Sequence, residues 1–450
     1  SVKAQERKQA GYEQQLKQFE GVNQPKITDV KLTIELYPHQ RRYQAKGQYL
    51  LKNLSKQPIT EIHVQHNRAL DPQVKLMKVD FDKVATPTQS FDELDYTIYQ
   101  LQKPLEPQEQ IKMNFVTAFT TQGFVEKPST LYESVLTNGT FIDNRHFPSL
   151  GYDPDMEIET DRTREKFGLP ARQNTFDSDH PKAHQHGILG DDAYKVNLEV
   201  VVGTAADQIA VAPGYLQKQW KKGQRAYFHY KMDRPIEHFY SIVSARYQVL
   251  RDSVMIQDQG KAKKIDLAIY YDAKHRYNLQ SMMRSMKHSL QYCSKNFSPY
   301  QYRQLRILEF PRYAGFAQSF ANMIPFSEGI GFVLDQRNTI DVAYKVTAHE
   351  VGHQWWAHQV MAAHVNGAGM VLESLAQYTA VMVMKKHLPK EQLQKYMEFE
   401  HHRYFRGRTR LREKETPLSE ASINPVYLQY GKGAVNLFAL QHYIGEDNVN

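Results

Sequence analysis

The spacing of apolar residues changes near residue 258, and this change divides the chain into two kinds of structure. Between residues 25 and 257 apolar and polar side chains alternate, for example at Val30, Leu32, Ile34 and Leu36. Because strands place successive side chains on opposite faces, this period of two predicts an antiparallel β domain over residues 25–258. Helical spacing becomes more frequent afterwards and predicts an α/β-to-helical domain over residues 259–450. The expected fold class is multidomain α+β.

Short stretches of sequence predict particular strands and helices within the second domain. We expect strands at residues 264–271, 304–310 and 330–334, and mostly helix from Asp341 onward. A long helix should follow the first strand, because apolar residues recur on one face at Leu279, Met282, Met283, Met286, Leu290, Cys293 and Phe297. Methionines at this spacing are more typical of a packed core than of a binding groove.

The first 24 residues differ from both domains. They are polar and rich in helix formers, and Tyr12, Leu16 and Phe19 are spaced to share one helical face. We therefore expect a helical lead-in over residues 1–24 that tethers the β domain to a preceding part. Ser1 is not an initiator methionine and no charged-then-apolar leader follows it, which favours a segment of a longer protein.

Composition excludes several classes of protein. The longest apolar run, residues 378–384, is far shorter than the roughly 20 residues that a membrane span needs, so we expect none in this segment. Cys293 is the only cysteine, which excludes an internal disulfide and a thiolate zinc cluster. The formal charge of +8 is spread along the chain, and its densest stretch, residues 403–414, is typical of a solvated helix or loop. We therefore predict no nucleic-acid partner.

The sequence His349-Glu350-Val351-Gly352-His353 lies in a helical stretch and predicts a metal site. Residues four apart are neighbours on a helix, so both imidazoles can face one point, and zinc accepts two such nitrogens. Glu350 is about 100° around the helix from His349. This position suits a carboxylate that holds and deprotonates a water beside the metal.

A zinc hydrolase needs a third protein ligand and an open position for water. We predict Glu373 as this ligand, because it begins another helix that can lie antiparallel to the first. His358 and His364 are alternatives, but His358 is about 140° off the face of His353 and His364 falls where the helix should end. A loop-rich stretch offers another set of possible ligands, although loop positions without regular spacing are more often solvent-exposed: Asp177, Asp179, His180, His184 and His186.

Four segments together resemble the M1 family of zinc aminopeptidases, which belongs to the gluzincins. The two histidines and distant glutamate are followed by Trp355-Trp356, residues 372–378 are similar to the family segment around its third ligand, and Tyr430-Gly431-Lys432-Gly433-Ala434 resembles a family signature. The β-rich half also resembles the family's N-terminal saddle. The resemblance implies a thermolysin-like catalytic domain with one zinc ion, which acts on peptides.

Three features depart from the common family pattern. Nineteen residues separate His353 from Glu373, the spacing of thermolysin, and we expect the extra residue in the turn at 366–369. The exopeptidase motif is replaced by residues 325–331, which include Glu328, and the chain ends 20 residues after Tyr430, so that the catalytic domain is short at its C-terminus. The first two features resemble divergent M1 domains fused to bacterial ABC-type permeases, which implies a membrane-associated parent protein in a bacterium.

The resemblance also assigns roles to individual residues. His349, His353 and Glu373 are the expected zinc ligands, and Glu350 is the expected general base. Tyr430 can donate a hydrogen bond to the oxyanion. Glu328 can bind the cationic N-terminus of a substrate, or it can be a surface glutamate in a Ser-Glu-Gly turn.

An aminopeptidase that acts on short peptides is the leading functional prediction. An endopeptidase is an alternative, because the spacing and the altered exopeptidase motif allow it. A peptidase-like regulatory or binding domain of a membrane transporter is another, although a scaffold has no physical need for the complete set of catalytic residue types.

Overall fold

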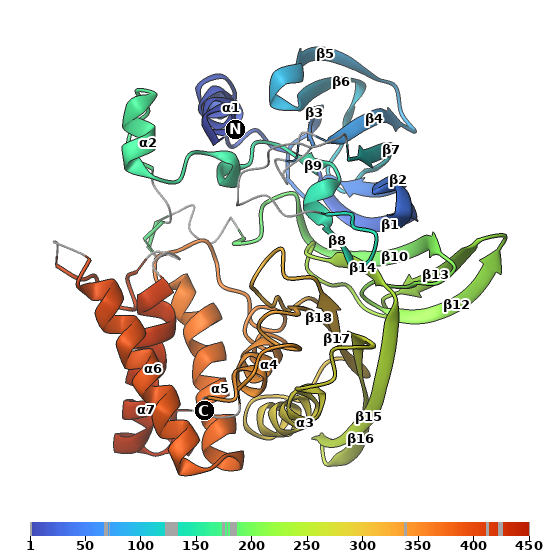
Figure 1. The fold of residues 1–450 in the computed structure, drawn as a ribbon. Helices are drawn as coiled ribbons and strands as arrows, with labels where there is room; N and C mark the ends of the chain where they lie inside the picture. Colours follow the sequence, from blue (N-terminus) through green and yellow to red (C-terminus); the bar gives the residue numbers. More distant parts are fainter. Residues whose placement is uncertain are drawn as a thin grey trace. The chain divides into compact units, whose positions relative to one another are not determined.

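The computed structural model describes residues 2–66, 71, 73–121, 134–172, 176–177, 179–180, 187–336, 340–410, 414–421 and 426–449. The chain forms two compact units. The first comprises Ser1–Gln173 and Leu189–Arg246, and the second comprises Asn174–Ile188 and Tyr247–Asn450. Strands dominate the first unit and helices dominate the later part of the second, which is the multidomain α+β class predicted from the sequence (Figure 1).

The main sheet of the first unit has seven strands in the order β12-β13-β10-β1-β2-β7-β4. In that order, the strands are Tyr215–Lys222, Arg225–Lys231, Ala193–Ala205, Lys26–Tyr37, Arg42–Lys52, Gln110–Thr120 and Val74–Phe81. The predicted alternation is confirmed in β1, where Val30, Leu32, Ile34 and Leu36 are all buried. The sheet is not purely antiparallel, because β1 and β10 pair in parallel. A parallel pair requires a long connection, and the residues between these strands provide it.

Two smaller sheets complete the strands of the first unit. The order β5-β6-β3-β9 joins Ala85–Phe91, Tyr96–Leu105, Ile59–Gln65 and Ser149–Leu150, and the order β11-β14-β8 joins Ile209–Val211, Ser241–Ala245 and Thr140–Asp143. Among the described residues of this unit, the helical elements are α1 (Val2–Leu16), α2 (Asp161–Lys166) and five short 3₁₀ turns: η1 (Lys17–Phe19), η2 (Pro38–Gln40), η3 (Asp92–Leu94), η4 (Asn144–His146) and η5 (Pro154–Met156).

The helical lead-in packs into the first unit. Tyr12 and Leu16 of α1 are buried in one apolar cluster with Leu94, Tyr96, Ile98 and Met156. The Tyr12 hydroxyl also donates a hydrogen bond to Gln65 over 2.8 Å. Tyr12 and Leu16, which were expected to share one helical face, therefore form the contact between α1 and the sheet β5-β6-β3-β9.

The second unit begins with a four-stranded sheet in the order β15-β16-β17-β18, comprising Tyr247–Asp258, Lys261–Asp272, Gln304–Phe310 and Met323–Ser327. The expected domain boundary at residue 258 falls one strand later than this division, because β15 pairs along its whole length with β16. The strand expected at 330–334 is wrong. Residues 328–333 form a turn in which the N–H groups of Phe332 and Val333 donate to the carbonyl of Glu328. The edge of this sheet is instead β18, which pairs in parallel with β17.

The described helical elements of the second unit are α3 (Leu279–Asn296), α4 (Val342–Gly352), α5 (Leu375–His387), α6 (Lys390–Arg408), α7 (Gly433–Ile444), the π-helical turns η6 (Met370–Ser374) and η7 (Tyr427–Lys432), and the 3₁₀ turn η8 (Glu446–Asn448). The apolar face of α3 is buried, as predicted, and α4 packs against both α3 and α5. Within the described part of the chain, no helix is long and apolar enough to span a membrane.

Candidate metal centre

Helix α4 carries both histidines of the predicted site. Its first turn is capped by Asp341, whose side chain accepts a hydrogen bond from the backbone N–H of Tyr344 over 2.9 Å. His349 lies in its last turn and His353 follows at the C-cap, so that one helical turn separates the two imidazoles. Their Nε2 atoms are 3.0 Å apart, and both side chains are largely buried.

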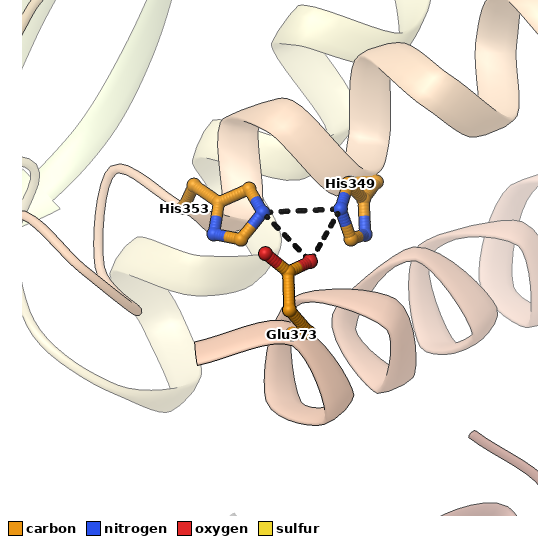
Figure 2. A group of neighbouring side chains, drawn as sticks. All are labelled: His349, His353 and Glu373. Atoms are coloured by element: carbon orange, nitrogen blue, oxygen red, sulfur yellow. Dashed lines mark hydrogen bonds and ion pairs between the residues drawn. The ribbon is translucent and has the colours of Figure 1, made fainter. Parts of the chain in front are cut away.

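Glu373 reaches the same point from η6, the π-helical turn that leads into α5 (Figure 2). Its Oε2 atom lies 3.4 Å from Nε2 of His349 and 3.5 Å from Nε2 of His353. A π-helical turn contains more residues than an α-helical turn, and such turns recur at functional sites. The additional residue between His353 and Glu373 was expected in the turn at 366–369. The wider π-helical turn at Met370–Ser374, which follows that turn, offers another place for it.

These three distances fit a zinc ion. Ligand bonds of about 2.0–2.1 Å in tetrahedral geometry place neighbouring ligand atoms about 3.3–3.4 Å apart. The separations of 3.0, 3.4 and 3.5 Å lie around this value. The two nitrogens and one oxygen also match the donor set of hydrolytic zinc sites, which leave one position open.

The protonation of two of the three groups, His349 and Glu373, suits a cation. Burial and the neighbouring imidazole of His353 lower the pKa of His349 to about 4, so that its ring is neutral near pH 7. Burial alone would raise the pKa of Glu373, but the two histidines outweigh it and hold this pKa well below its usual range. A neutral imidazole and an ionised carboxylate are the forms that bind metals.

The backbone fixes the orientation of the second imidazole. Nδ1 of His353 lies 2.9 Å from the carbonyl oxygen of Trp356, and a carbonyl can only accept a hydrogen bond. Nδ1 therefore carries a proton, and the neutral form of the ring presents the lone pair of Nε2 to a metal. Trp356 is itself held by α5, because its indole N–H donates to the hydroxyl of Thr379 over 3.0 Å.

Glu350 is buried next to the three ligand atoms. Burial raises its pKa to about 7, an effect that the nearby His353 opposes and the Glu373 carboxylate reinforces. A backbone hydrogen bond from Ser319 also stabilises the ionised form. Gln354 fastens the segment around Ser319 to the end of α4, since its amide donates to the Ser319 hydroxyl at 2.6 Å and to the Phe320 carbonyl at 2.8 Å.

Tyr430 lies close to His349. It belongs to η7, and its ring centroid is 5.4 Å from that of His349. Burial raises the pKa of its phenol, and the Glu373 carboxylate adds to this effect, so the hydroxyl stays protonated and can donate. Gly433 permits this placement, because a Cβ atom there would lie 2.2 Å from the hydroxyl of Ser374.

Glu328 lies just after β18 and belongs to a separate group of titratable side chains. The ligand atoms of His275, Glu309 and Glu328 all lie within 4.8 Å of one another. Nδ1 of His275 is hydrogen-bonded to Glu309 and lies 3.8 Å from Oε2 of Glu328. Glu328 is thus a partly exposed residue whose titratable neighbours include His275 and Glu309. The backbone of Ser319, not Glu328, is hydrogen-bonded to Glu350.

The other candidate ligands have different partners. Nε2 of His358 lies 3.1 Å from the carbonyl oxygen of Ser319, and the atoms that converge with those of His349 do not include His364. In the loop, Asp177 accepts a hydrogen bond from Asn366 over 2.7 Å, and the described residues of that loop form no group of potential metal ligands. His184 and His186 lie outside the described residues.

Solved structures that share this fold include M1 zinc metallopeptidases. One from Deinococcus radiodurans aligns with a TM-score of 0.61 and 14% identity, covering 95% of this chain and 85% of that chain. A mutant of the Deinococcus radiodurans M1 zinc metallopeptidase bound to a Tyr-Ser-Ala substrate gives 0.60 and 14%, covering 94% and 84%. The chain has the two-domain fold of M1 zinc metallopeptidases. No family model matches the sequence, and no curated protein matches it.

Within this fold, the structure adds two contacts that the sequence did not predict. The Trp356 carbonyl orients His353, and the Ser319 segment contacts Glu350. The tryptophan pair was a visible signal for the first contact, although it did not indicate that the backbone carbonyl was the contacting group. Residues 316–320 have no periodicity that would have revealed the second.

Proposed function

We propose that this protein is a zinc-dependent peptidase and that it removes N-terminal residues from peptides. The observation that supports the proposal is the convergence of Nε2 of His349, Nε2 of His353 and Oε2 of Glu373, with the Glu350 carboxylate buried beside them. Two imidazoles and a carboxylate form a zinc site with one open position, as hydrolytic chemistry requires.

Each residue has a defined role in this proposal. Zinc, when bound to His349, His353 and Glu373, supplies the polarisation of the scissile carbonyl and a more acidic water. Glu350 accepts a proton from the attacking water and delivers it to the leaving amine. Tyr430 donates a hydrogen bond to the carbonyl oxygen as negative charge develops on it. The phenol suits this task because its raised pKa keeps the proton in place before reaction.

Glu328 is the proposed contact for the cationic N-terminus of the substrate. Its side chain is partly exposed, and a carboxylate attracts an ammonium group more strongly where water is partly excluded. Solved structures of M1 zinc metallopeptidases include complexes with a Tyr-Ser-Ala substrate, L-tryptophan and L-arginine, which supports short peptides as the substrate class.

Substitution of the general base tests the hydrolytic proposal. Glu350→Gln should slow hydrolysis of an aminoacyl amide reporter by about 10²- to 10⁴-fold, because Gln cannot accept the proton. Zinc content should stay at the wild-type level, since Glu350 is not a ligand. Glu391→Gln, on the exposed face of α6, is the matched control and should retain full activity. A fully active Glu350→Gln enzyme would refute the assignment.

Two alternatives from the sequence give different results in simple assays. An endopeptidase would cleave N-acetylated peptides as readily as free ones, whereas an aminopeptidase should reject them. Glu328→Gln should raise KM for free peptides if this residue binds the substrate amine. A regulatory or binding domain of a membrane transporter, as in the permease-fused proteins, would bind peptides without cleaving them.

A further inference from the structure

Arg403 belongs to the most basic stretch of the sequence, yet it contacts a residue of the proposed active site. Its guanidinium carbon lies 5.2 Å from the centroid of the Tyr430 ring, and its side chain is only 26% exposed. A guanidinium within about 6 Å of an aromatic ring is attracted by the negative charge on the ring face. The interpretation of residues 403–414 as a solvated face therefore does not hold for Arg403.

A buried carboxylate one turn earlier holds Arg403 in place. Nη1 of Arg403 lies 3.4 Å from Oε2 of Glu400, whose side chain is completely buried in α6. The Gln377 amide of α5 donates a hydrogen bond to Oε1 of Glu400 over 2.8 Å. A carboxylate in such surroundings is costly unless cations and hydrogen bonds compensate its charge, so these contacts constrain one another.

The same carboxylate is connected to the helix of the two histidines. Nζ of Lys345 lies 3.8 Å from Oε1 of Glu400. Lys345 is one turn before His349 on α4, so the two side chains lie on the same face of that helix. Glu400 thereby joins α4, α5 and α6, and α4 carries both histidines of the candidate metal centre.

Close backbone contact fixes Tyr430 relative to α6. A Cβ atom on Gly431 would lie 3.1 Å from the carbonyl oxygen of Glu400 and 3.0 Å from the backbone nitrogen of Tyr404. Only glycine permits this approach without a shift of one element. The ring of Tyr430 thus lies next to Arg403 and also close to His349.

We propose that Arg403 is a positioning residue that acts through Tyr430. Anchored by Glu400, its guanidinium holds the ring so that the phenol faces the reacting carbonyl, and its positive charge strengthens the hydrogen bond that the phenol donates. This inference rests on the role of Tyr430 in the proposed function.

Kinetics with a double-mutant cycle test the inference. Arg403→Ala should lower kcat by about 3- to 30-fold with little change in KM, and Arg403→Lys should restore part of the loss because it retains the charge. In a Tyr430→Phe background, Arg403→Ala should have no further effect, because the group through which it acts is gone. Arg406→Ala, an exposed position three residues further along α6, is the matched control.

A second measurement does not depend on activity. With ¹³C-labelled tyrosine, the ring signal that disappears in Tyr430→Phe is that of Tyr430. It should shift in Arg403→Ala and stay unchanged in Arg406→Ala. The inference is overturned if that signal does not move, or if Arg403→Ala slows the Tyr430→Phe enzyme as much as it slows the wild type. Failure of the proposed function would show differently, as a wild-type enzyme without activity or a fully active Glu350→Gln variant.

Discussion

The hydroxyl of Ser374 donates a hydrogen bond to the backbone carbonyl of Gln429 over 2.7 Å, and this contact joins the two π-helical turns of the candidate site. Ser374 follows the proposed ligand Glu373, and Gln429 precedes Tyr430. The spacing between the ligand and the phenol is therefore set by a direct contact between their neighbours. Gly433, one turn after Gln429, packs against the same serine.

We expect Gly433→Ala to disturb this contact. The new methyl group would lie 2.2 Å from the Ser374 hydroxyl and would force η6 and η7 apart. Overpacking of this kind typically costs about 1–3 kcal/mol of stability, and displacement of Tyr430 should also lower kcat. Thermal unfolding and reporter kinetics measure both effects. Gly11→Ala in α1 is the control, because its nearest neighbour would lie 3.6 Å away and alanine favours helix.

The single thiol reports on the core of the second unit. Cys293 is completely buried in α3, and burial raises its pKa well above the usual range. Because the thiolate is the reactive form, we expect an alkylating reagent to leave the folded protein unmodified and to label one thiol after unfolding in urea. Mass spectrometry distinguishes the two states. Rapid labelling of the folded protein would contradict the described packing of α3 against α4.

Glu309 should make stability depend on pH. Burial raises the pKa of its carboxyl to about 7, while hydrogen bonds from Asp272 and His275 oppose the shift. Between the unfolded pKa near 4.3 and the folded value, the folded state holds more protons, so this group's contribution to stability falls as the pH rises. Glu309→Gln lacks this penalty and should gain about 1–3 kcal/mol relative to wild type between pH 5 and pH 8.

Urea unfolding of wild type and Glu309→Gln at several pH values measures this difference. Glu391→Gln, an exposed carboxylate of α6, should show a constant difference from wild type over the same range. A Glu309→Gln difference that is equally flat would show that the carboxyl is not perturbed.

The parts of the fold that the sequence predicted are those with a strong local pattern. Alternation identified β1, and the methionine face identified α3, because burial on one face leaves a periodic trace. The strand expected at 330–334 was wrong because a short apolar run does not reveal the turn that the carbonyl of Glu328 closes. Pairing partners such as β1 and β10 are far apart in sequence, and local spacing carries no information about them.

The candidate site likewise contains features that local spacing predicted and features that it could not predict. The spacing of His349 and His353 predicted that their nitrogens would meet, because that geometry belongs to a single helix. The environment of Glu328 could not be derived, because His275 and Glu309 come from separate segments that meet only in the folded unit. Arg403 could not be distinguished from its basic neighbours for the same reason.

Zinc should stabilise the protein through His349, His353 and Glu373. A ligand that binds only the folded state adds about 2.7 kcal/mol when its concentration is 100 times the Kd. We therefore expect a chelator to lower the Tm and added Zn²⁺ to restore it. The variants His349→Ala and Glu373→Gln should lose most of this response, because each removes one of three ligands.

The matched controls separate metal binding from general damage to the fold. His442→Ala removes an exposed imidazole of α7 and should keep the full zinc response, and Glu350→Gln should keep it because that carboxylate lies beside the metal and is not a ligand. Metal content after dialysis should follow the same order, with about one zinc per chain in wild type and both controls. If His349→Ala retained the zinc response of the wild type, the ion would be bound elsewhere, and the proposed centre would be wrong.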